Sequence, residues 1–418
     1  MCVCNTHAQR IDFNYHGTQF SAIMSSEKKP KKTSKRPSKK PSEDKLEEFV
    51  ETQLSCLKLE EAAEKRKKCF WHVLTGQAIG SDFDEDVGSL VFFSIVSSNA
   101  KVKKGESLAA MVGSKRSKRG IVYEITHDSF TLSVKNTQSF PIGRETKFCA
   151  LPCDNSEVQR AVGEILSSSV YKAGEPATRV RDVLMGSARP RTSTQLKPIE
   201  FFNQRLDKSQ REAVTWCTKQ KEVAVIHGPP GTGKSTTLVE LVKQAMARGE
   251  KVLVCAASNA AVDNMLERVK KASCTDLVRI GHPANVDKAH AKMTLESLAR
   301  KKKKKGAAQT GEDSERAILI GARVVFGTLT GCFREVTRAN FCDKVLKAFL
   351  QVSSLPPKHF SLTIVDECGQ AMEAAVWTVV RSTSNSSYLV KFSCKSLLSH
   401  RSLSKMYLFA AGRGIMIF

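Results

Sequence analysis

Residues 223–237 constrain the fold of this chain most, because an apolar run there leads directly into the loop HGPPGTGKSTT. The loop matches the pattern G-x-x-x-x-G-K-[S/T] in full, and a helix is predicted to follow it over residues 235–248. Glycines let successive backbone N–H groups converge on a phosphate, and the helix begins with its positive dipole end facing that anion. The sequence therefore predicts a nucleotide-binding loop. The alternative is a glycine-rich strand-to-helix turn that binds no nucleotide.

The residues of this loop divide the contacts that a nucleoside triphosphate and Mg²⁺ require. Lys234 is expected to reach the β- and γ-phosphates, and the Ser235 hydroxyl is expected to ligate Mg²⁺. The full predicted set of nucleotide-binding residues in the loop is Gly228, Pro229, Pro230, Gly231, Thr232, Gly233, Lys234, Ser235 and Thr236.

Charge and composition limit the classes of partner. The chain of 418 residues has a net charge of +24, which favours a polyanionic partner, nucleic acid before an acidic membrane. Charge that serves solubility alone is the alternative. The 13 cysteines are scattered, so we expect free thiols, an intracellular protein and no zinc site. No apolar run reaches about 18 residues and no apolar signal core opens the chain, so neither a membrane span nor secretion is expected.

The region before the loop is predicted to hold a tail, a helix and a small barrel. Residues 1–41 are expected to be a disordered basic tail, and its lysine-rich stretch fits a nuclear-import signal, a nucleic-acid arm or a solubilising tail. Residues 42–73 are predicted to form a stalk helix, and residues 153–195 a returning helix over 156–166 and a linker. Short strand patterns over 74–152 predict a β-barrel between the two helices. One of its turns is expected to carry Lys115, Arg116, Lys118 and Arg119, either on a phosphate backbone or in solvent.

Residues 196–377 are predicted to form an α/β domain with a parallel sheet. Helical segments alternate with β-branched runs that are typical of strands buried on both faces. The predicted strands cover residues 222–227, 251–256, 322–327 and 361–365.

Two adjacent carboxylates, Asp366 and Glu367, end the last of these strands. Ligands of such sheets bind at the carboxyl ends of the strands. Asp366 is therefore predicted to hold Mg²⁺ through its water shell, and Glu367 to orient or deprotonate an attacking water. An acidic pair alone would carry no weight, because carboxylates commonly end strands. Together with the loop it predicts hydrolysis of a nucleoside triphosphate.

Six segments, in this order, resemble the first motor domain of superfamily 1 helicases of the up-frameshift type, with immunoglobulin-mu-binding and DNA-polymerase-α-associated helicases the most similar. The segments are LDKSQREAV, HGPPGTGKSTT, VLVCAASNAAVDNM, VRIGHPANV, ARVVFGTLTG and VDECGQAMEAA. The predicted helix, barrel and helix also resemble the stalk and 1B barrel of that family. The resemblance covers residues 42–377 and implies a RecA-like domain over 196–377.

The resemblance implies further roles and partners. Gln210 would read the adenine of ATP, and Gln370 would help to sense the γ-phosphate. Ser258, Asn259 and Thr328 would line the track of single-stranded DNA or RNA, with little reading of sequence. Without the resemblance these three are ordinary strand-end residues. The family acts by ATP hydrolysis coupled to 5′ to 3′ movement, and we expect a monomer in the nucleus and cytoplasm.

Three departures from the family stand out. Asn285 replaces a usual arginine, and residues 300–305, RKKKKK, form an inserted loop that either grips the strand or is disordered. Residues 378–418 contain no Asp or Glu and are expected to be a non-homologous tail where the family continues into a second motor domain. A fragment of this kind would hydrolyse ATP poorly, because that domain supplies the arginine finger. The competing hypothesis is a non-enzymatic nucleic-acid-binding module with an ATP site; a P-loop kinase is the weaker third.

Overall fold

The computed structural model describes most of the chain between residues 43 and 332, and shorter parts on either side. The described residues are 9–15, 18–24, 43–67, 73–99, 101–112, 115–151, 156–166, 171, 173–174, 176–193, 198–228, 231–304, 311–332, 359–380, 383–393 and 415–417. The basic stretch of the predicted tail, residues 28–40, lies outside them.

A seven-stranded parallel sheet organises the second half of the chain, in the order β11-β12-β10-β13-β14-β9-β15. The expected α/β fold with a RecA-like parallel sheet is confirmed. The strands are β9 (Val223–His227), β10 (Val252–Ala256), β11 (Leu277–Ile280), β12 (Val324–Thr328), β13 (Phe360–Asp366), β14 (Thr383–Ser393) and β15 (Ile415–Ile417).

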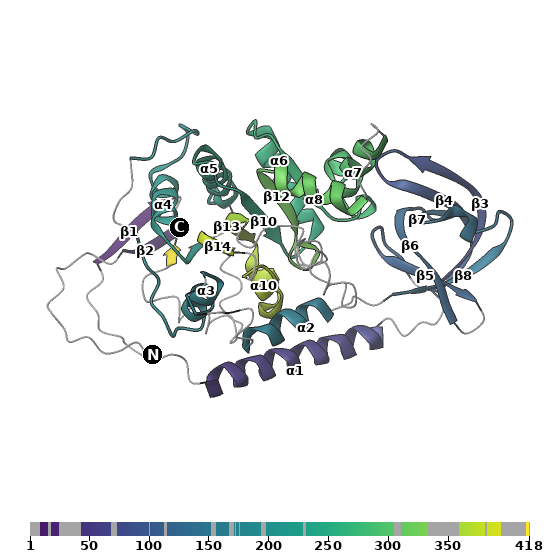
Figure 1. Ribbon diagram of the computed structural model, residues 1–418, viewed down its shortest axis with the longest axis horizontal. Coiled ribbons are helices and arrows are strands. Elements are labelled where there is room, and N and C mark those ends of the chain that lie inside the picture. The colour runs from purple at the N-terminus through teal and green to yellow at the C-terminus, as the bar shows by residue number, and fades with distance from the viewer. Residues whose placement is uncertain are drawn as a thin grey trace.

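Helices cover both faces of this sheet (Figure 1). Successive residues of a strand point to opposite faces, and both faces are apolar, so the sheet sits between two hydrophobic cores. On one face Ala224 and Ile226 pack with α4 and α5, and on the other Val223 and Val225 pack with α1, α2, α3 and α10. The helices are α1 (Glu43–Lys67), α2 (Ser156–Gly163), α3 (Pro176–Leu184), α4 (Lys208–Lys219), α5 (Lys234–Ala247), α6 (Asn259–Lys271), α7 (Leu295–Lys304), α8 (Gly311–Gly321) and α10 (Glu373–Val380).

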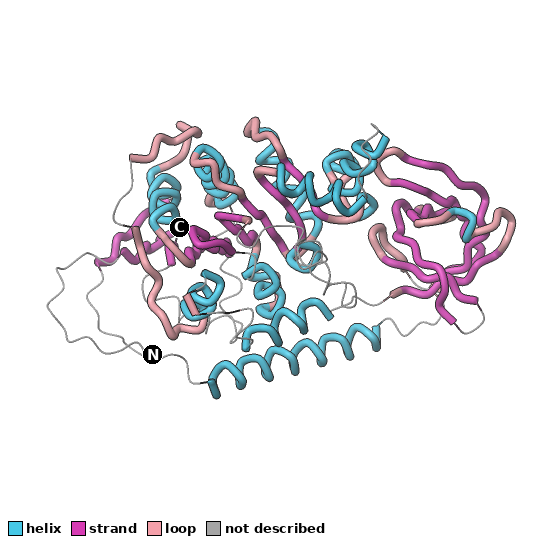
Figure 2. The backbone as a smooth tube through the Cα atoms, viewed as in Figure 1, coloured by secondary structure: helices cyan, strands magenta, loops and turns pink. Residues whose placement is uncertain are grey.

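A closed six-stranded antiparallel barrel lies at one end of the molecule (Figure 2). Its interior is filled by phenylalanines, with Phe93 stacked on Phe130 at 4.8 Å between ring centroids and both packed edge-on against Phe148. Its strands are β3 (Leu74–Asp84), β4 (Gly88–Ser98), β5 (Ser107–Val112), β6 (Lys115–Ile125), β7 (Ser129–Val134) and β8 (Glu145–Ala150). The predicted barrel is confirmed as a set of strands. Lys118 and Arg119 lie exposed in strand β6, however, so the prediction of a turn there was wrong.

The long helix α1 runs beneath the sheet beside α2 (Figure 1). Its apolar stripe of Leu46, Val50 and Leu57 is buried, and Phe49 packs edge-on against Trp377 of α10 at 5.7 Å between ring centroids. The side-chain amide of Gln53 donates to Glu373 at 3.0 Å. The stalk is thereby fastened to the helix that follows the carboxylate pair.

Short 3₁₀ helices complete the described structure. They are η1 (Thr137–Ser139), η2 (Glu164–Leu166), η3 (Pro283–Asn285), η4 (Lys288–Met293) and η5 (Cys368–Gln370).

Several segments differ from the expectation. Residues 176–184 of the supposed linker form α3, because Ala177, Val180 and Val183 give it an apolar face for the sheet. The predicted disordered tail contains an antiparallel pair, β1 (Gln9–Tyr15) and β2 (Thr18–Met24). Arg300 and the lysines up to Lys304 end helix α7 and are no loop.

The C-terminal stretch also contributes to the sheet. Strand β14 lies between β13 and β9, and β15 lies on the outer side of β9. The carboxylate strand and the glycine-loop strand are therefore joined through a strand from the segment expected to be a non-homologous tail. The boundaries of the domains themselves stay predictions.

Candidate nucleotide and nucleic-acid site

The register of the sheet brings the predicted site residues to one edge. Ala256 pairs with Thr328 on one side and with Asp366 on the other. Strand β14 links β13 and β9 in the same register, since Lys391 pairs with Val365 of β13 and with Val225 of β9. The loop that starts at Gly228, the carboxylate pair and the two polar strand ends therefore all leave the sheet at its carboxyl edge, where ligands of such sheets bind.

The glycine loop has the backbone conformation that its sequence requires. Gly231 and Gly233 have φ values of +84° and +77°, a region that L-residues rarely adopt. Gly233 is the N-cap of α5 and provides no capping side chain, so no side chain of this residue occupies the amides at the start of the helix, where an anion is favoured. Pro229 and Pro230 lie outside the described residues.

Gln210 lies against this loop. Its side chain accepts from the Asp207 amide at 3.2 Å while Asp207 caps the Gln210 amide at 2.8 Å, which fixes the start of α4. The Gln210 Nε2 atom donates to the Thr232 carbonyl at 3.3 Å. A Cβ atom at position 233 would collide with that nitrogen, so Gln210 would have to move, and φ of +77° disfavours any side chain there. The predicted adenine-reading residue therefore touches the loop.

The charged and hydroxyl groups of the loop sit at the start of α5. The Lys234 ammonium donates to the Gly228 carbonyl at 2.6 Å, so it lies across the loop. Ser235 and Thr236 are half-buried in the first turn. These groups fit a triphosphate: glycines in the left-handed region, a lysine on the loop and a helix N-terminus behind it.

The two carboxylates differ in environment. Asp366 is 9% exposed, and burial raises its pKa; the Glu367 amide, which donates to Asp366 at 2.9 Å, and the charge of Lys234 act in the opposite direction. Glu367 is exposed and has φ of +47°, an unfavourable conformation for a residue with a side chain. Gln370 follows it, also exposed. The hydroxyl of Ser235 and the carboxylate of Asp366 are the hard oxygen donors that Mg²⁺ prefers.

The three residues expected on the nucleic-acid track have local partners. The Ser258 hydroxyl caps α6 by accepting from the Ala261 amide at 3.2 Å, and the Thr328 hydroxyl accepts from the Gly331 amide at 3.1 Å. The Asn259 Oδ1 atom accepts from Arg279 at 2.9 Å. Each of the three is at least partly exposed.

A buried arginine behind Asn259 was not foreseen from the sequence. Arg279 of β11 is fully buried and forms an ion pair with Asp263 of α6 at 2.8 Å. The other carboxylate oxygen of Asp263 accepts from the Asp287 amide at 2.9 Å. The sequence does contain a pattern that could have predicted it: an arginine within the apolar run VRI must be buried if that run is a strand of this sheet.

The barrel contacts helix α7 of the domain. Asp86, in the turn between β3 and β4, lies 2.7 Å from Lys301 and accepts from the Ser297 hydroxyl at 2.7 Å. Arg300 donates to the Asp86 and Glu85 carbonyls. The start of the basic run therefore holds the barrel. Lys302 and Lys303 are exposed, and Lys305 lies outside the described residues.

Asn285, where the family has an arginine, also lies at this junction. Its Oδ1 atom is buried, and a Cβ atom at Gly105 of the barrel would come within 3.0 Å of it. Asn285 therefore packs in the contact between the α/β domain and the barrel.

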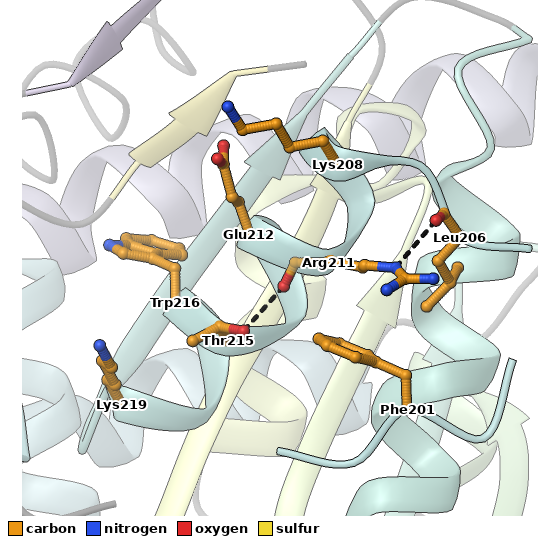
Figure 3. Close-up of a pocket in the computed structure, with 8 residues that line it drawn as sticks. All are labelled: Phe201, Leu206, Lys208, Arg211, Glu212, Thr215, Trp216 and Lys219. Atoms are coloured by element: carbon orange, nitrogen blue, oxygen red, sulfur yellow. Dashed lines mark hydrogen bonds between the residues drawn. The ribbon is translucent and has the colours of Figure 1, made fainter. Parts of the chain in front are cut away.

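A separate cavity of about 620 Å³ opens on the outer side of α4 (Figure 3). Arg211 stacks over Phe201 at 5.4 Å and donates to the Leu206 carbonyl at 3.0 Å, while Trp216 and Lys219 line the other flank. None of the predicted site residues lines this cavity, although Gln210 lies on the same helix.

Among the residues that the structure describes, no group of three or more His, Cys, Asp or Glu side chains is arranged to hold a metal ion. Among the same residues, no helix has both the length and the apolar composition needed to cross a membrane.

The comparisons with known proteins agree with this geometry. Residues 205–317 match a family model described as an AAA domain. DNA-binding protein SMUBP-2 of Mesocricetus auratus is 34% identical over 285 residues, which cover 62% of this chain and 29% of that protein. DNA polymerase alpha-associated DNA helicase A of Schizosaccharomyces pombe is 45% identical over 208 residues, which cover 43% of this chain and 30% of that protein. The resemblance to superfamily 1 helicases of the up-frameshift type is confirmed.

The chain spans less than a third of the length of these two relatives. Among solved structures, the UvsW helicase from bacteriophage T4 is similar at a TM-score of 0.31 and 16% identity, covering 55% of this chain and 63% of that one. A likeness of that size supports no argument about fold or function.

Proposed function

We propose that the carboxyl edge of the sheet binds ATP with Mg²⁺ and hydrolyses it in response to single-stranded nucleic acid, as part of an ATP-dependent helicase. One observation carries the proposal. The glycine loop with Lys234, the pair Asp366 and Glu367, and the polar loop at Ser258 leave β9, β13 and β10 of one parallel sheet at the same edge, with β14 between β9 and β13. A P-loop and a carboxylate pair at one edge of a sheet are the arrangement that phosphoryl transfer to water requires.

The residues divide the work as follows. Gly231, Thr232, Gly233, Lys234, Ser235 and Thr236 hold the phosphates, and Gln210 reads the adenine. Ser235 and Asp366 hold Mg²⁺, which supplies charge neutralisation at the phosphates when bound. Glu367 orients the attacking water, and Gln370 responds to the γ-phosphate. Ser258, Asn259 and Thr328 contact the sugar-phosphate backbone.

The partner and the location follow from the same proposal. The net charge of +24 and two relatives named as DNA-binding or DNA-polymerase-associated support a nucleic-acid partner. DNA is the better supported substrate, and RNA fits the same backbone contacts. We place the protein in the nucleus, with a cytoplasmic pool, and as a monomer.

The alternative is a nucleic-acid-binding module whose ATP site does not turn over. The strand between β13 and β9 comes from residues 383–393, within a stretch that carries no Asp or Glu. No acid from that strand therefore joins Asp366 and Glu367 at the edge. Binding and turnover have to be measured separately for this reason.

The test is steady-state ATPase, with and without single-stranded DNA or RNA at low salt, beside binding of a fluorescent ATP analogue. Lys234→Ala should abolish nucleotide binding, and Glu367→Gln should keep binding and lose at least about a hundredfold in turnover. Lys221→Ala and Glu212→Gln are matched controls, because Lys221 is exposed before the start of β9, at the opposite edge of the sheet from the loop, and Glu212 lines the separate cavity.

Three outcomes distinguish the helicase proposal from the binding-module alternative. Turnover that rises with nucleic acid and disappears in both variants supports the helicase proposal. Binding of ATP and nucleic acid without turnover supports the binding module. Wild-type protein that binds no nucleotide, or ATPase that survives Lys234→Ala, refutes both.

A further inference from the structure

Arg279 is the most completely buried charge in the described part of the chain that touches a proposed nucleic-acid residue. Its exposed fraction is 0%, and its guanidinium makes three kinds of contact at once. The Nε atom donates to Asp263 at 2.8 Å, one terminal nitrogen donates to the Ile280 carbonyl at 2.5 Å, and the other donates to Asn259 at 2.9 Å. Each of the three guanidinium nitrogens thus donates a hydrogen bond inside the protein.

These contacts decide which way the Asn259 amide points. A guanidinium has only donors, so the atom that faces it must be the Asn259 oxygen. The Nδ2 donor is thereby turned away from Arg279. Among the described residues no partner accepts from it, and the side chain is partly exposed. Beside it lies the first turn of α6, capped by Ser258, where backbone N–H groups attract anions.

The same arginine fixes the helix that carries Asn259. Asp263 is one turn further along α6, so the guanidinium holds the helix at two successive turns. Gly281 has φ of +148° and a Cβ atom there would approach the guanidinium to 3.2 Å, which shows how closely the backbone wraps it. Residue 259 therefore has little freedom to reorient when a strand arrives.

We propose that Arg279 is a positioning residue for nucleic-acid binding: it holds the Asn259 amide so that its Nδ2 donates to a backbone phosphate. Arg279 itself does not touch the strand. The inference rests on the proposed function, since it needs a strand that passes the carboxyl edge. It predicts that the two residues act on binding as one unit.

The first experiment is a double-mutant cycle on the affinity for a fluorescein-labelled oligothymidylate, measured by anisotropy with the full chain. Arg279→Lys keeps the charge beside Asp263 but lacks the fork that reaches Asn259 as well. We expect Arg279→Lys to weaken binding about tenfold in the wild-type background and less than twofold in the Asn259→Ala background. Equal losses in the two backgrounds would mean that Arg279 only supports the fold, and would overturn the inference.

A second variant keeps the test valid if Arg279→Lys does not fold. Asn259→Asp still offers an oxygen to Arg279, and a carboxylate at the start of a helix is favourable, so the melting temperature should hold within about 2 °C. The variant has no Nδ2 donor, and we expect at least a tenfold loss of affinity. Asn264→Asp, exposed on the same helix, adds the same charge and should cost less than threefold.

The failures are distinguishable. A wild-type chain that binds ATP but no oligothymidylate refutes the nucleic-acid part of the proposed function. A wild-type chain that binds the oligonucleotide while Asn259→Asp and Asn264→Asp behave alike refutes only the positioning role of Arg279.

Discussion

Two carboxylates with the same 9% exposure, Asp263 and Asp366, lie in opposite situations. Asp263 meets the Arg279 guanidinium and the Asp287 amide, so charge and hydrogen bonds are matched within the protein. Asp366 accepts from the Glu367 amide but has no cation in contact within the described part of the chain, and burial raises its pKa. A buried charge that the fold leaves without a counter-charge destabilises the folded state, whereas a paired one becomes costly only when its partner is removed. We infer that Asp366 is available to bind a ligand, whereas Asp263 stabilises the fold.

Neutralising each carboxylate in turn should have opposite effects on stability. Asp263→Asn leaves the buried Arg279 charge without a counter-charge, and we expect a loss of about 3 kcal/mol in unfolding free energy, or several degrees in melting temperature. Asp366→Asn removes a poorly compensated charge, so the melting temperature should stay or rise while ATP turnover falls at least about a hundredfold. Differential scanning fluorimetry and steady-state ATPase measure the two effects. Equal destabilisation by both substitutions would contradict the comparison.

The sequence predicted the region around Asp366 better than the region around Asp263. The glycine loop and the carboxylate pair are contiguous patterns that a strand must precede, so the strands β9 and β13 could be placed from the sequence within two residues. Arg279, Asp263 and Asn259 are separated in the chain by up to 20 positions and meet only through the packing of α6 on β11. Strand β11 has four residues, too few for a period to be recognised.

The junction with the barrel shows the same limit. Residues 300–305 were interpreted by their charge alone, as a loop that either grips a nucleic acid or is disordered. The structure instead pairs Lys301 with Asp86, more than 200 positions earlier in the chain. A pairing over that distance leaves no local signal. The same holds for strand β14, whose place between β13 and β9 could not be inferred from a stretch without acids.

His282, next to this junction, provides a pH test of structural burial. Burial, with the charge of Arg300, lowers its pKa to about 4, and its Nδ1 atom accepts from the Ala284 amide at 3.2 Å, which requires the neutral ring. Because the unfolded chain has a histidine pKa of about 6.5, the unfolded state binds the extra proton between these values. The stabilising contribution is therefore complete above about pH 6.5 and is lost as the pH falls toward 4.

The measurement compares wild type with His282→Asn, whose side-chain oxygen can replace the Nδ1 acceptor. The side chain is 26% exposed, so solvent screens part of the effect of the pKa shift. Between pH 7.5 and 5.0 the unfolding free energy of wild type should therefore fall by about 1 to 2 kcal/mol more than that of the variant. His359, whose burial also lowers its pKa to about 4, is unchanged in both proteins and cancels. Melting curves with the same pH dependence in both proteins would show that His282 is not buried as a neutral ring.

The smallest expected effect is at Asp86, because this ion pair is partly open to solvent. The side chains of Asp86 and Lys301 are 35% and 41% exposed, and the hydrogen bond to Lys301 is the main cause that lowers the pKa of Asp86. Asp86→Ala should reduce the unfolding free energy by about 1 kcal/mol, and less at high salt, where exposed pairs are screened. Lys301→Ala should do the same, and the double variant should cost little more than either single one, whereas Lys302→Ala, exposed on the same helix, should have no effect. If Asp86→Ala instead lowers ATP turnover without lowering the melting temperature, the junction takes part in the reaction cycle, and the separation between structural and ligand-binding charges does not hold there.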